Sequence, residues 1–574
     1  MKLRTSLCNP TALKKDITRF APVWVLYSVG LFLLMSILFT CEGEYYRASN
    51  LADSLMLLTE VNFGYGFLNA LLLFGDLFQA RNCNALHAMP LRRECWYSTH
   101  VLAGLLFSLV PNVVFCAVLM PMLGSGVPVV GYWLAGMTLQ YLFFFGLGVF
   151  SALCVGNRFA MVLVYGILNF FAMIVYWFYT TLYQPLLQGV QTDGLVFMPF
   201  CPIVQMFRHQ EMVKLIGTDG SYYTRQVLNV VPGDGWGYLG ICAVLGVVLL
   251  GLSLVLYRRR KLESAGDFMA VKMLEPVFLV VYTLCMAAFF QIIGWLVGEL
   301  EYLFLMLGLP VGFFTGRMLL MRTTRVFQPK SFLWFVVFLV AFGASLLITS
   351  LDPLGITRRI PATETVAQVK IANHNPVYSP NPYFTDPADI DAVREMHRLI
   401  LAGDGEVEGQ VDDARRANIY ILYDMADGTT LQRHYEIAVK SKAGQMFGEL
   451  TGRPEFVLGT TDVDQIAANV NYLYYTFEPL KMDGQLNDPI HFTNQDREAV
   501  RLLLEAIVAD AREGHMNQHW GFRDQDVESI GWLDLGYVGA DGVHRYLNLT
   551  IYSDAAHTIA YFQQNPLPGV EYHD

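Results

Sequence analysis

The sequence predicts a polytopic α-helical membrane protein of about nine spans, followed by a C-terminal soluble α+β domain. Hydrophobic residues make up 54% of the 574-residue chain and charged residues only 16%, whereas a soluble chain carries about a quarter charged residues. Residues 1–351 contain 22 Lys and Arg against 16 Asp and Glu, and residues 352–574 contain 17 against 34. The first part is therefore apolar and mildly basic, and the second has the composition of an acidic, water-soluble domain.

A short amphipathic segment precedes the first span. Residues 1–20 predict a cytoplasmic interfacial helix, because Leu13, Ile17 and Phe20 fall on one face. The alternative is a basic flank that only orients the first span. Nine stretches that follow are apolar over the ~20 residues that a membrane-crossing helix needs. They comprise residues 21–41, 56–79, 99–121, 130–154, 159–182, 237–257, 275–298, 301–320 and 332–350.

The distribution of Lys and Arg predicts the orientation. With the N-terminus in the cytoplasm, the inner segments hold 18 Lys and Arg and the outer loops hold four, as the positive-inside rule expects. Nine spans then place residues 351–574 outside the cell, whereas eight would place them in the cytoplasm. We therefore expect a multi-pass protein of the cell membrane with an extracellular C-terminal domain. The acidic charge of that domain argues against nucleic acid as a partner.

The second span carries four polar residues, which are Glu60, Asn62, Asn69 and Asp76. Asn62, Asn69 and Asp76 are spaced by seven residues, so a continuous helix would place them on nearly one face. Polar groups are costly in lipid and should face the bundle or a water-filled path. One interpretation is that they line a substrate path. The favoured alternative is ordinary hydrogen bonding between spans.

The C-terminal domain predicts two similar halves. A strand at residues 365–371 is followed by a helix and a hairpin within residues 384–440, and a helix and a hairpin recur within residues 492–552. This pattern indicates an internal duplication with an antiparallel sheet and helices on one face. The histidines are scattered and no HExxH motif occurs. We therefore expect no metal, no cofactor and no catalytic site in this domain.

Two motifs resemble permeases of the ABC-2 type from Gram-positive bacteria. They are NPTALKKD, which begins at Asn9, and the loop LHAMPLRREC, which begins at Leu86. The resemblance covers about residues 1–260 and implies a six-span module over residues 21–257. It also implies that the loop between spans two and three forms a coupling helix that docks on a separate ATPase subunit. The residues of this loop that would take part are Arg81, Leu86, His87, Met89, Pro90, Arg92 and Arg93.

The same resemblance implies a large outer loop at residues 183–236 with short interfacial helices, one of them at residues 203–216. The chain departs from the simple family pattern by three additional spans within residues 258–350 and by the appended domain at residues 351–574. It is similar in this respect to a subset of these permeases that carries a C-terminal extracellular domain.

The resemblance implies a permease subunit that pairs with a second copy or a paralogue and works by alternating access. It would export or remove an amphiphilic substrate or an antimicrobial compound. The sequence contains no G-x-x-x-x-G-K-[ST] motif, which is the phosphate-binding loop of many ATPases. ATP hydrolysis would therefore come from the partner, and we expect no enzyme activity of this chain. The alternative function is a membrane-anchored sensor whose outer domain binds a ligand or an envelope component.

Overall fold

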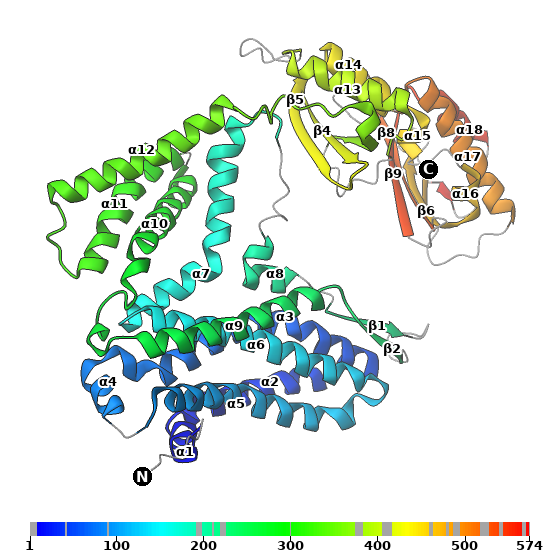
Figure 1. Cartoon of the computed structure of the whole chain (residues 1–574). Helices are drawn as coiled ribbons and strands as arrows, with labels where there is room; N and C mark the ends of the chain where they lie inside the picture. Colours follow the sequence, from blue (N-terminus) through cyan, green and yellow to red (C-terminus); the bar gives the residue numbers. More distant parts are fainter. Residues whose placement is uncertain are drawn as a thin grey trace. The chain divides into compact units, whose positions relative to one another are not determined.

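The structure is a computed structural model, and it divides the chain into two compact units (Figure 1). The membrane unit comprises Met1–Leu182 and Asp193–Ser345, and the C-terminal unit comprises Tyr183–Thr192 and Leu346–Asp574. All residues are described except 1–7, 41–42, 89–90, 191–197, 209–211, 218–225, 299, 374–382, 405–415, 459–462, 478–481, 486–493, 517–526, 539–543, 565–569 and 573–574.

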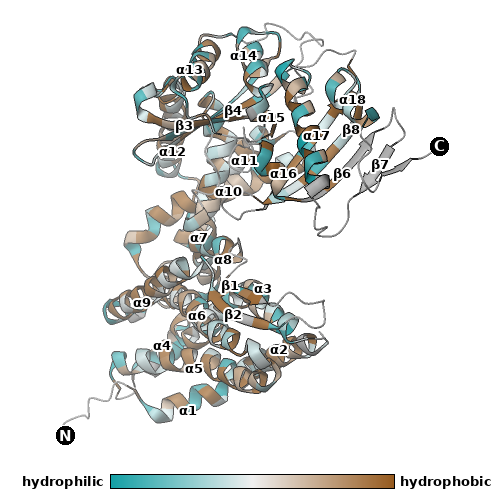
Figure 2. Ribbon diagram, turned by 90° about the vertical axis from the view of Figure 1, so that its right-hand side faces the viewer, coloured by the Kyte–Doolittle hydropathy of each residue, from teal (hydrophilic) through white to brown (hydrophobic). Residues whose placement is uncertain are grey.

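The predicted fold class is confirmed. Among the described residues, eight helices are long and apolar enough to cross a membrane, and a pair of helices bent by 62° can supply a ninth span. Hydrophobic residues predominate along many of these helices (Figure 2). The bent pair is α1 (Pro10–Arg19) and α2 (Ala21–Phe39), and the others are α3 (Glu44–Leu73), α5 (Arg93–Leu119), α6 (Pro128–Cys154), α7 (Arg158–Phe178), α9 (Trp236–Arg259), α10 (Glu275–Gly298), α11 (Glu301–Met321) and α12 (Pro329–Leu351).

The second long helix differs from its prediction at both ends. Helix α3 begins at Glu44, earlier than predicted, because several polar residues form its first turns. The prediction followed apolar character alone and therefore missed these turns. It ends at Leu73, and a 3₁₀ turn, η1 (Gly75–Phe78), follows. Asp76 therefore lies beyond the helix, and the predicted common face holds only for Asn62 and Asn69.

Glycines allow three helices of the membrane unit to approach one another at backbone distance. A Cβ atom added to Gly146 of α6 would lie 2.6 Å from the carbonyl oxygen of Gly246 in α9, and one added to Gly246 would lie 2.8 Å from the carbonyl oxygen of Leu142. A Cβ atom on Gly66 of α3 would lie 2.8 Å from the backbone nitrogen of Phe145. Small residues of this kind are the usual contacts between membrane helices, and here they fix α3, α6 and α9 as one packed group.

The segment between α7 and α9 contains a short helix, α8 (Pro202–Arg208), and a hairpin of β1 (Val213–Gly217) and β2 (Val227–Pro232). The expected helix over residues 203–216 is therefore helical only in its first half. Lys214 pairs with Val231 and Leu215 with Val230. The β-branched residues of both strands favour this extended pairing, and the amphipathic pattern alone did not reveal it.

The C-terminal unit contains two α+β modules. The first comprises β3 (Val366–Ala372), α13 (Pro387–Leu401), β4 (Arg416–Met425), β5 (Thr430–Ala438) and α14 (Lys442–Thr451), with sheet order β3-β4-β5. The second has sheet order β10-β7-β6-β8-β9. Its elements are α15 (Pro454–Leu458), α16 (Val463–Ala468), β6 (Val470–Phe477), β7 (Met482–Gln485), α17 (Asn494–Arg512), β8 (Ser529–Val538), β9 (His544–Tyr552), α18 (Ala556–Gln564) and β10 (Val570–Tyr572).

The two modules share an element order and a capping contact. In each, a strand, a long helix, a hairpin and a second helix follow one another, although β7 is added in the second. Asp404 accepts a hydrogen bond from the backbone of Ala443 at 2.7 Å, at the start of α14. Asp510 accepts one from the backbone of Thr558 at 2.7 Å, at the start of α18. These similarities agree with an internal duplication, and a common origin of the halves stays a prediction.

Candidate functional site

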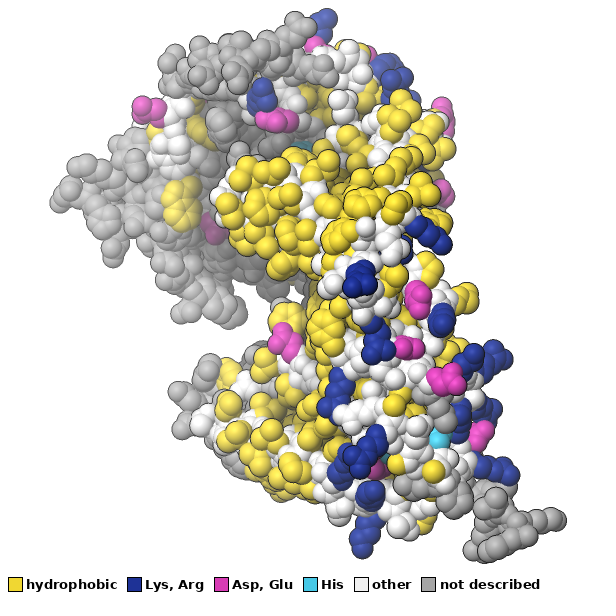
Figure 3. Space-filling model, turned by 90° about the vertical axis from the view of Figure 1, so that its left-hand side faces the viewer, with side chains coloured by type: hydrophobic (Ala, Val, Ile, Leu, Met, Phe, Trp, Pro, Cys, Tyr) yellow, Lys and Arg dark blue, Asp and Glu magenta, His cyan; other side chains and the backbone are white. Residues whose placement is uncertain are grey.

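The loop between α3 and α5 contains a short helix, α4 (Ala80–His87), within the segment predicted to couple to a partner. Figure 3 views the molecule from the side on which α4 lies in Figure 1, and many Lys and Arg side chains gather over the membrane unit there. Arg81 and Arg92 are exposed and make no side-chain hydrogen bond within the described part of the chain. The side chain of Leu86, together with Met89 and Pro90, lies outside the described residues.

Arg93 is directed into the protein rather than to the outside. Its Nη1 atom donates to the carbonyl oxygens of Tyr257, Arg258 and Arg260, at 3.3, 3.2 and 2.9 Å. These carbonyls lie at the end of α9, where a cation stabilises the helix terminus. Arg260 in turn donates to the carbonyl of Leu77 at 3.3 Å. The two arginines therefore join the loop around α4 to the end of α9.

His87 and Asp76 attach α4 to its surroundings at two further points. The Nε2 atom of His87 lies 3.3 Å from the hydroxyl of Tyr257 in α9. Asp76 accepts a hydrogen bond from Asn82 of α4 at 3.2 Å and pairs with Arg19 of α1 at 3.2 Å. Helix α4 is thus connected through side chains to α1 and to α9.

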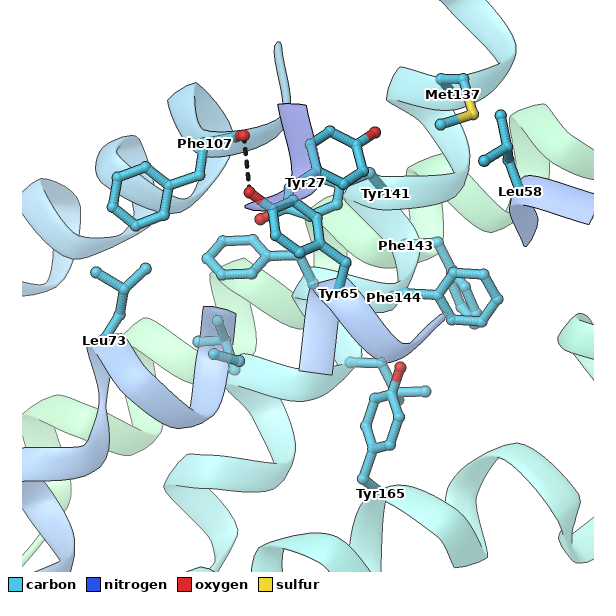
Figure 4. Close-up of a cluster of buried hydrophobic side chains, with 14 of the residues drawn as sticks. Tyr27, Leu58, Tyr65, Leu73, Phe107, Met137, Tyr141, Phe143, Phe144 and Tyr165 are labelled. Atoms are coloured by element: carbon cyan, nitrogen blue, oxygen red, sulfur yellow. Dashed lines mark hydrogen bonds between the residues drawn. The ribbon is translucent and has the colours of Figure 1, made fainter. Parts of the chain in front are cut away.

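Asn62 and Asn69 are fully buried and bind α6. The Nδ2 atom of Asn62 donates to Gln140 at 3.0 Å, and that of Asn69 donates to the hydroxyl of Tyr141 at 2.9 Å. Figure 4 shows the aromatic surroundings, in which the hydroxyl of Tyr65 donates to the carbonyl of Phe107 at 2.9 Å. Both asparagines therefore make the interhelical contacts that the favoured alternative describes, and a path-lining role for them stays a prediction.

Glu60 differs from the asparagines because it is exposed. It shares an exposed stripe of α3 with Leu57, Gly64 and Leu68, and a Cβ atom added to Gly64 would meet nothing within 4 Å. At 1.5 Å per residue, Glu60 lies about 20 Å from the end of α3 at Leu73. This depth is within a hydrocarbon core of about 30 Å. Composition alone did not separate Glu60 from the buried polar residues of the same span.

The C-terminal unit has a junction that sequence reasoning missed. Arg433 of β5 is 1% exposed, and its Nη2 atom donates to the carbonyl of Ile356, just after α12, at 2.7 Å. Its backbone forms a β-bridge with Val190, which follows α7, and the next residue, His434, donates from its backbone to Gly189 at 3.0 Å. The segments that leave α7 and α12 therefore meet on one strand. In the described part of the chain, four long helices, α9 to α12, separate these segments, and an even number of spans puts both on the same side of a membrane.

His397 of α13 is fully buried between two tyrosines of the first module. Its Nε2 atom lies 2.8 Å from the hydroxyl of Tyr435, and its Nδ1 atom lies 3.2 Å from the hydroxyl of Tyr423. Burial, aided by the charge of Arg433, lowers the pKa of His397 to about 3. A neutral imidazole can donate to one hydroxyl and accept from the other, so we assign it a structural role.

This burial predicts a loss of stability in acid. Because the folded pKa lies below the unfolded value of about 6.5, the contribution of His397 is complete above that pH and is lost as the pH falls toward 3, by about 1.4 kcal/mol per pH unit. After correction for the intrinsic exchange rate of each amide, the protection of α13 in the full chain should therefore fall between pH 7 and pH 5 more steeply in the wild type than in His397→Gln. Equal pH dependence in the two proteins would contradict this assignment.

Asp510, Glu513 and His557 form a group of potential metal ligands in the described residues. The carboxylate of Asp510 already accepts three hydrogen bonds from the start of α18, from the backbones of His557 and Thr558 at 2.9 and 2.7 Å and from the hydroxyl of Thr558 at 2.6 Å. Its geometry is explained by helix capping, and we assign no metal to the group.

Comparisons with known proteins add no relative. No protein-family model, no curated protein and no solved structure matches this chain.

Proposed function

We propose that this chain is the permease subunit of a transporter of the ABC-2 type, driven by a separate ATPase chain that docks on α4. The observation that carries the proposal is the arrangement of α4, which is a short helix between two long apolar ones. It is connected to the bundle by side-chain contacts, while Arg81 within it and Arg92 after it are exposed. Both arginines are therefore accessible to a partner that has an acidic groove.

A push on α4 has a defined route into the bundle. His87 contacts Tyr257 of α9, and Arg93 holds the last carbonyls of the same helix. Helix α9 packs against α6 at backbone distance through Gly146 and Gly246, and packed elements of this kind move as bodies rather than deform. ATP-driven closure of the partner would therefore tilt α6 and α9 together and expose the substrate path alternately to the two sides.

Glu60 supports a path beside α3 and a second subunit. A carboxylate at this depth costs about 2.5–3.5 kcal/mol if it faces lipid, so its stripe should face water or protein. The stripe consists of Glu60 together with Leu57, Gly64 and Leu68. A second copy or a paralogue that packs over this stripe would create a path that is both apolar and charged. Such a lining suits the export of an amphiphilic compound, including an antimicrobial one.

The positive-inside rule assigns the α4 end to the cytoplasm and the C-terminal unit to the exterior. The junction at Arg433 also favours a second candidate function. A ligand bound by the outer domain could bias the segments that leave α7 and α12, because both are held by β5. In that case the chain would be a membrane-anchored sensor for an envelope component or a peptide.

Copurification tests the first candidate against the second. The full chain is purified in mild detergent, and its stoichiometric partners are identified by mass spectrometry. We expect a P-loop ATPase with the wild type, and its loss from the double variant Arg81→Glu with Arg92→Glu. The matched control is Arg325→Glu with Lys330→Glu, since both residues are exposed, the first in the loop before α12 and the second in the first turn of α12. Absence of an ATPase, or equal capture by both variants, would refute the docking site.

A further inference from the structure

A small cavity lies at the same end of the membrane unit, apart from the exposed arginines beside α4. Its volume is about 120 Å³, and it opens where α1 meets α2, where α3 ends and where α7 begins. The cavity combines charged and apolar walls. Its lining comprises Arg19, Phe20, Leu71, Leu72, Asp76 and Arg158, together with the backbone at Gly75.

The charges of the lining favour an anion. Two arginines face one aspartate, which leaves one positive charge in excess. Asp76 is occupied by Arg19 and Asn82, each at 3.2 Å. Arg158 is exposed and forms no hydrogen bond or ion pair within the described part of the chain. A guanidinium has five N–H donors, so Arg158 and the remaining donors of Arg19 are available to a ligand.

Local contacts position both guanidinium groups. The guanidinium of Arg19 lies over the ring of Phe20, 5.1 Å from its centroid. Arg158 is the first residue of α7, and Asn157 caps that helix by accepting a hydrogen bond from the backbone of Ala160 at 2.8 Å. The guanidinium of Arg158 lies beside Gly75, since a Cβ atom on Gly75 would be 3.9 Å from its Nη2 atom. The two cations thus come to one cavity from two helices far apart in the sequence, α1 and α7.

We infer that this cavity binds a phosphate group, held between Arg19 and Arg158. Arginine pairs are the preferred partners of phosphate oxygens because their planar donors match them bidentately. The apolar side chains of Leu71, Leu72 and Phe20 beside the charges fit the glycerol and upper acyl region of a phospholipid. A soluble phosphate compound offers the same head-group chemistry without the acyl chains. This inference does not depend on the proposed transport activity.

Thermal unfolding of the full chain in zwitterionic detergent tests the site, since a ligand of the folded state raises the melting temperature with concentration. The probes are dioctanoyl phosphatidylglycerol, dioctanoyl phosphatidylcholine and inorganic phosphate. We expect saturable stabilisation by phosphatidylglycerol, with apparent affinity at least about tenfold weaker in Arg158→Gln, as for loss of a charged hydrogen bond. Arg158→Lys keeps the charge, so its affinity should lie between those of the wild type and Arg158→Gln. Arg325→Gln should bind phosphatidylglycerol as the wild type does.

Asp76→Asn should change the affinity for the probes in the opposite direction. It removes the carboxylate that competes for Arg19, so phosphate-bearing probes should bind more tightly than to the wild type. Binding of phosphatidylglycerol alone would identify a lipid site, and binding of inorganic phosphate as well would identify a site for the phosphate group itself. The inference is overturned if no probe binds, if Arg158→Gln and Arg325→Gln bind alike, or if Asp76→Asn weakens binding.

Discussion

Replacing Gly246 by leucine is expected to prevent correct assembly of the membrane unit. A Cβ atom at this position would already lie 2.8 Å from the backbone of both Leu142 and Phe143 in α6. Backbone cannot move aside as a flexible side chain can, so the expected cost is about 3 kcal/mol or more, at the upper end of overpacking effects. The measurement is the yield of monodisperse protein in size-exclusion chromatography, together with its melting temperature.

Helix α9 offers a matched control for this substitution. A Cβ atom on Gly251 would meet nothing within 4 Å, and the residue is exposed on the same helix. Gly251→Leu should therefore assemble as the wild type does. Equal behaviour of the two leucine variants would show that α6 and α9 are not packed at backbone distance.

Replacing Arg433 by methionine is expected to release the segment that leaves α12. The substitution replaces the aliphatic stem of arginine by an unbranched apolar side chain and leaves the carbonyl oxygens of Ile356 and Arg359 without their donor. Buried groups that lose a partner cost about 1–3 kcal/mol each, so we expect a loss of about 2–4 kcal/mol from the C-terminal unit. Trypsin should then cut the full chain after Arg358 and Arg359 faster than in the wild type.

Arg398→Met is the control for Arg433→Met, because Arg398 is exposed and its ion pair among the described residues is with Glu395 of its own helix. Its effect should stay within about 0.5 kcal/mol, with unchanged cleavage. Unchanged cleavage in Arg433→Met as well would mean that the junction is not held by this side chain.

The helical spans were predictable from sequence because lipid imposes long apolar runs. The additional spans within residues 258–350 correspond to α10, α11 and α12. In the C-terminal unit, α13 (Pro387–Leu401) lies within residues 384–440, where a helix was predicted, and Asp386 and Pro387 are strong start signals for it. Local sequence determines these features, so local patterns were sufficient to find them.

Features that depend on distant partners were not predictable in the same way. The role of Arg433 depends on Val190 and Ile356, which lie far away in the chain. The inward direction of Arg93 depends on the end of α9, and no local pattern distinguishes it from the exposed Arg92 beside it. Tertiary contacts also decide which polar residues of α3 are buried.

Accessibility of position 60 tests most directly the proposal that ATP drives alternating access. Glu60→Cys is placed in the full chain, reconstituted in vesicles with its copurified ATPase, and labelled with a water-soluble maleimide. Because the chain has nine native cysteines, labelling is measured by mass spectrometry on the peptide that contains the introduced cysteine. The labelling rate is compared between the nucleotide-free complex and the complex trapped with ADP and vanadate. Val244→Cys on α9 serves as a lipid-facing control, being 64% exposed in an apolar region. We predict that labelling at position 60 changes severalfold on trapping while position 244 stays unlabelled. If position 60 is not labelled in either state, or if its labelling rate does not change with nucleotide, the proposal of ATP-driven alternating access is contradicted.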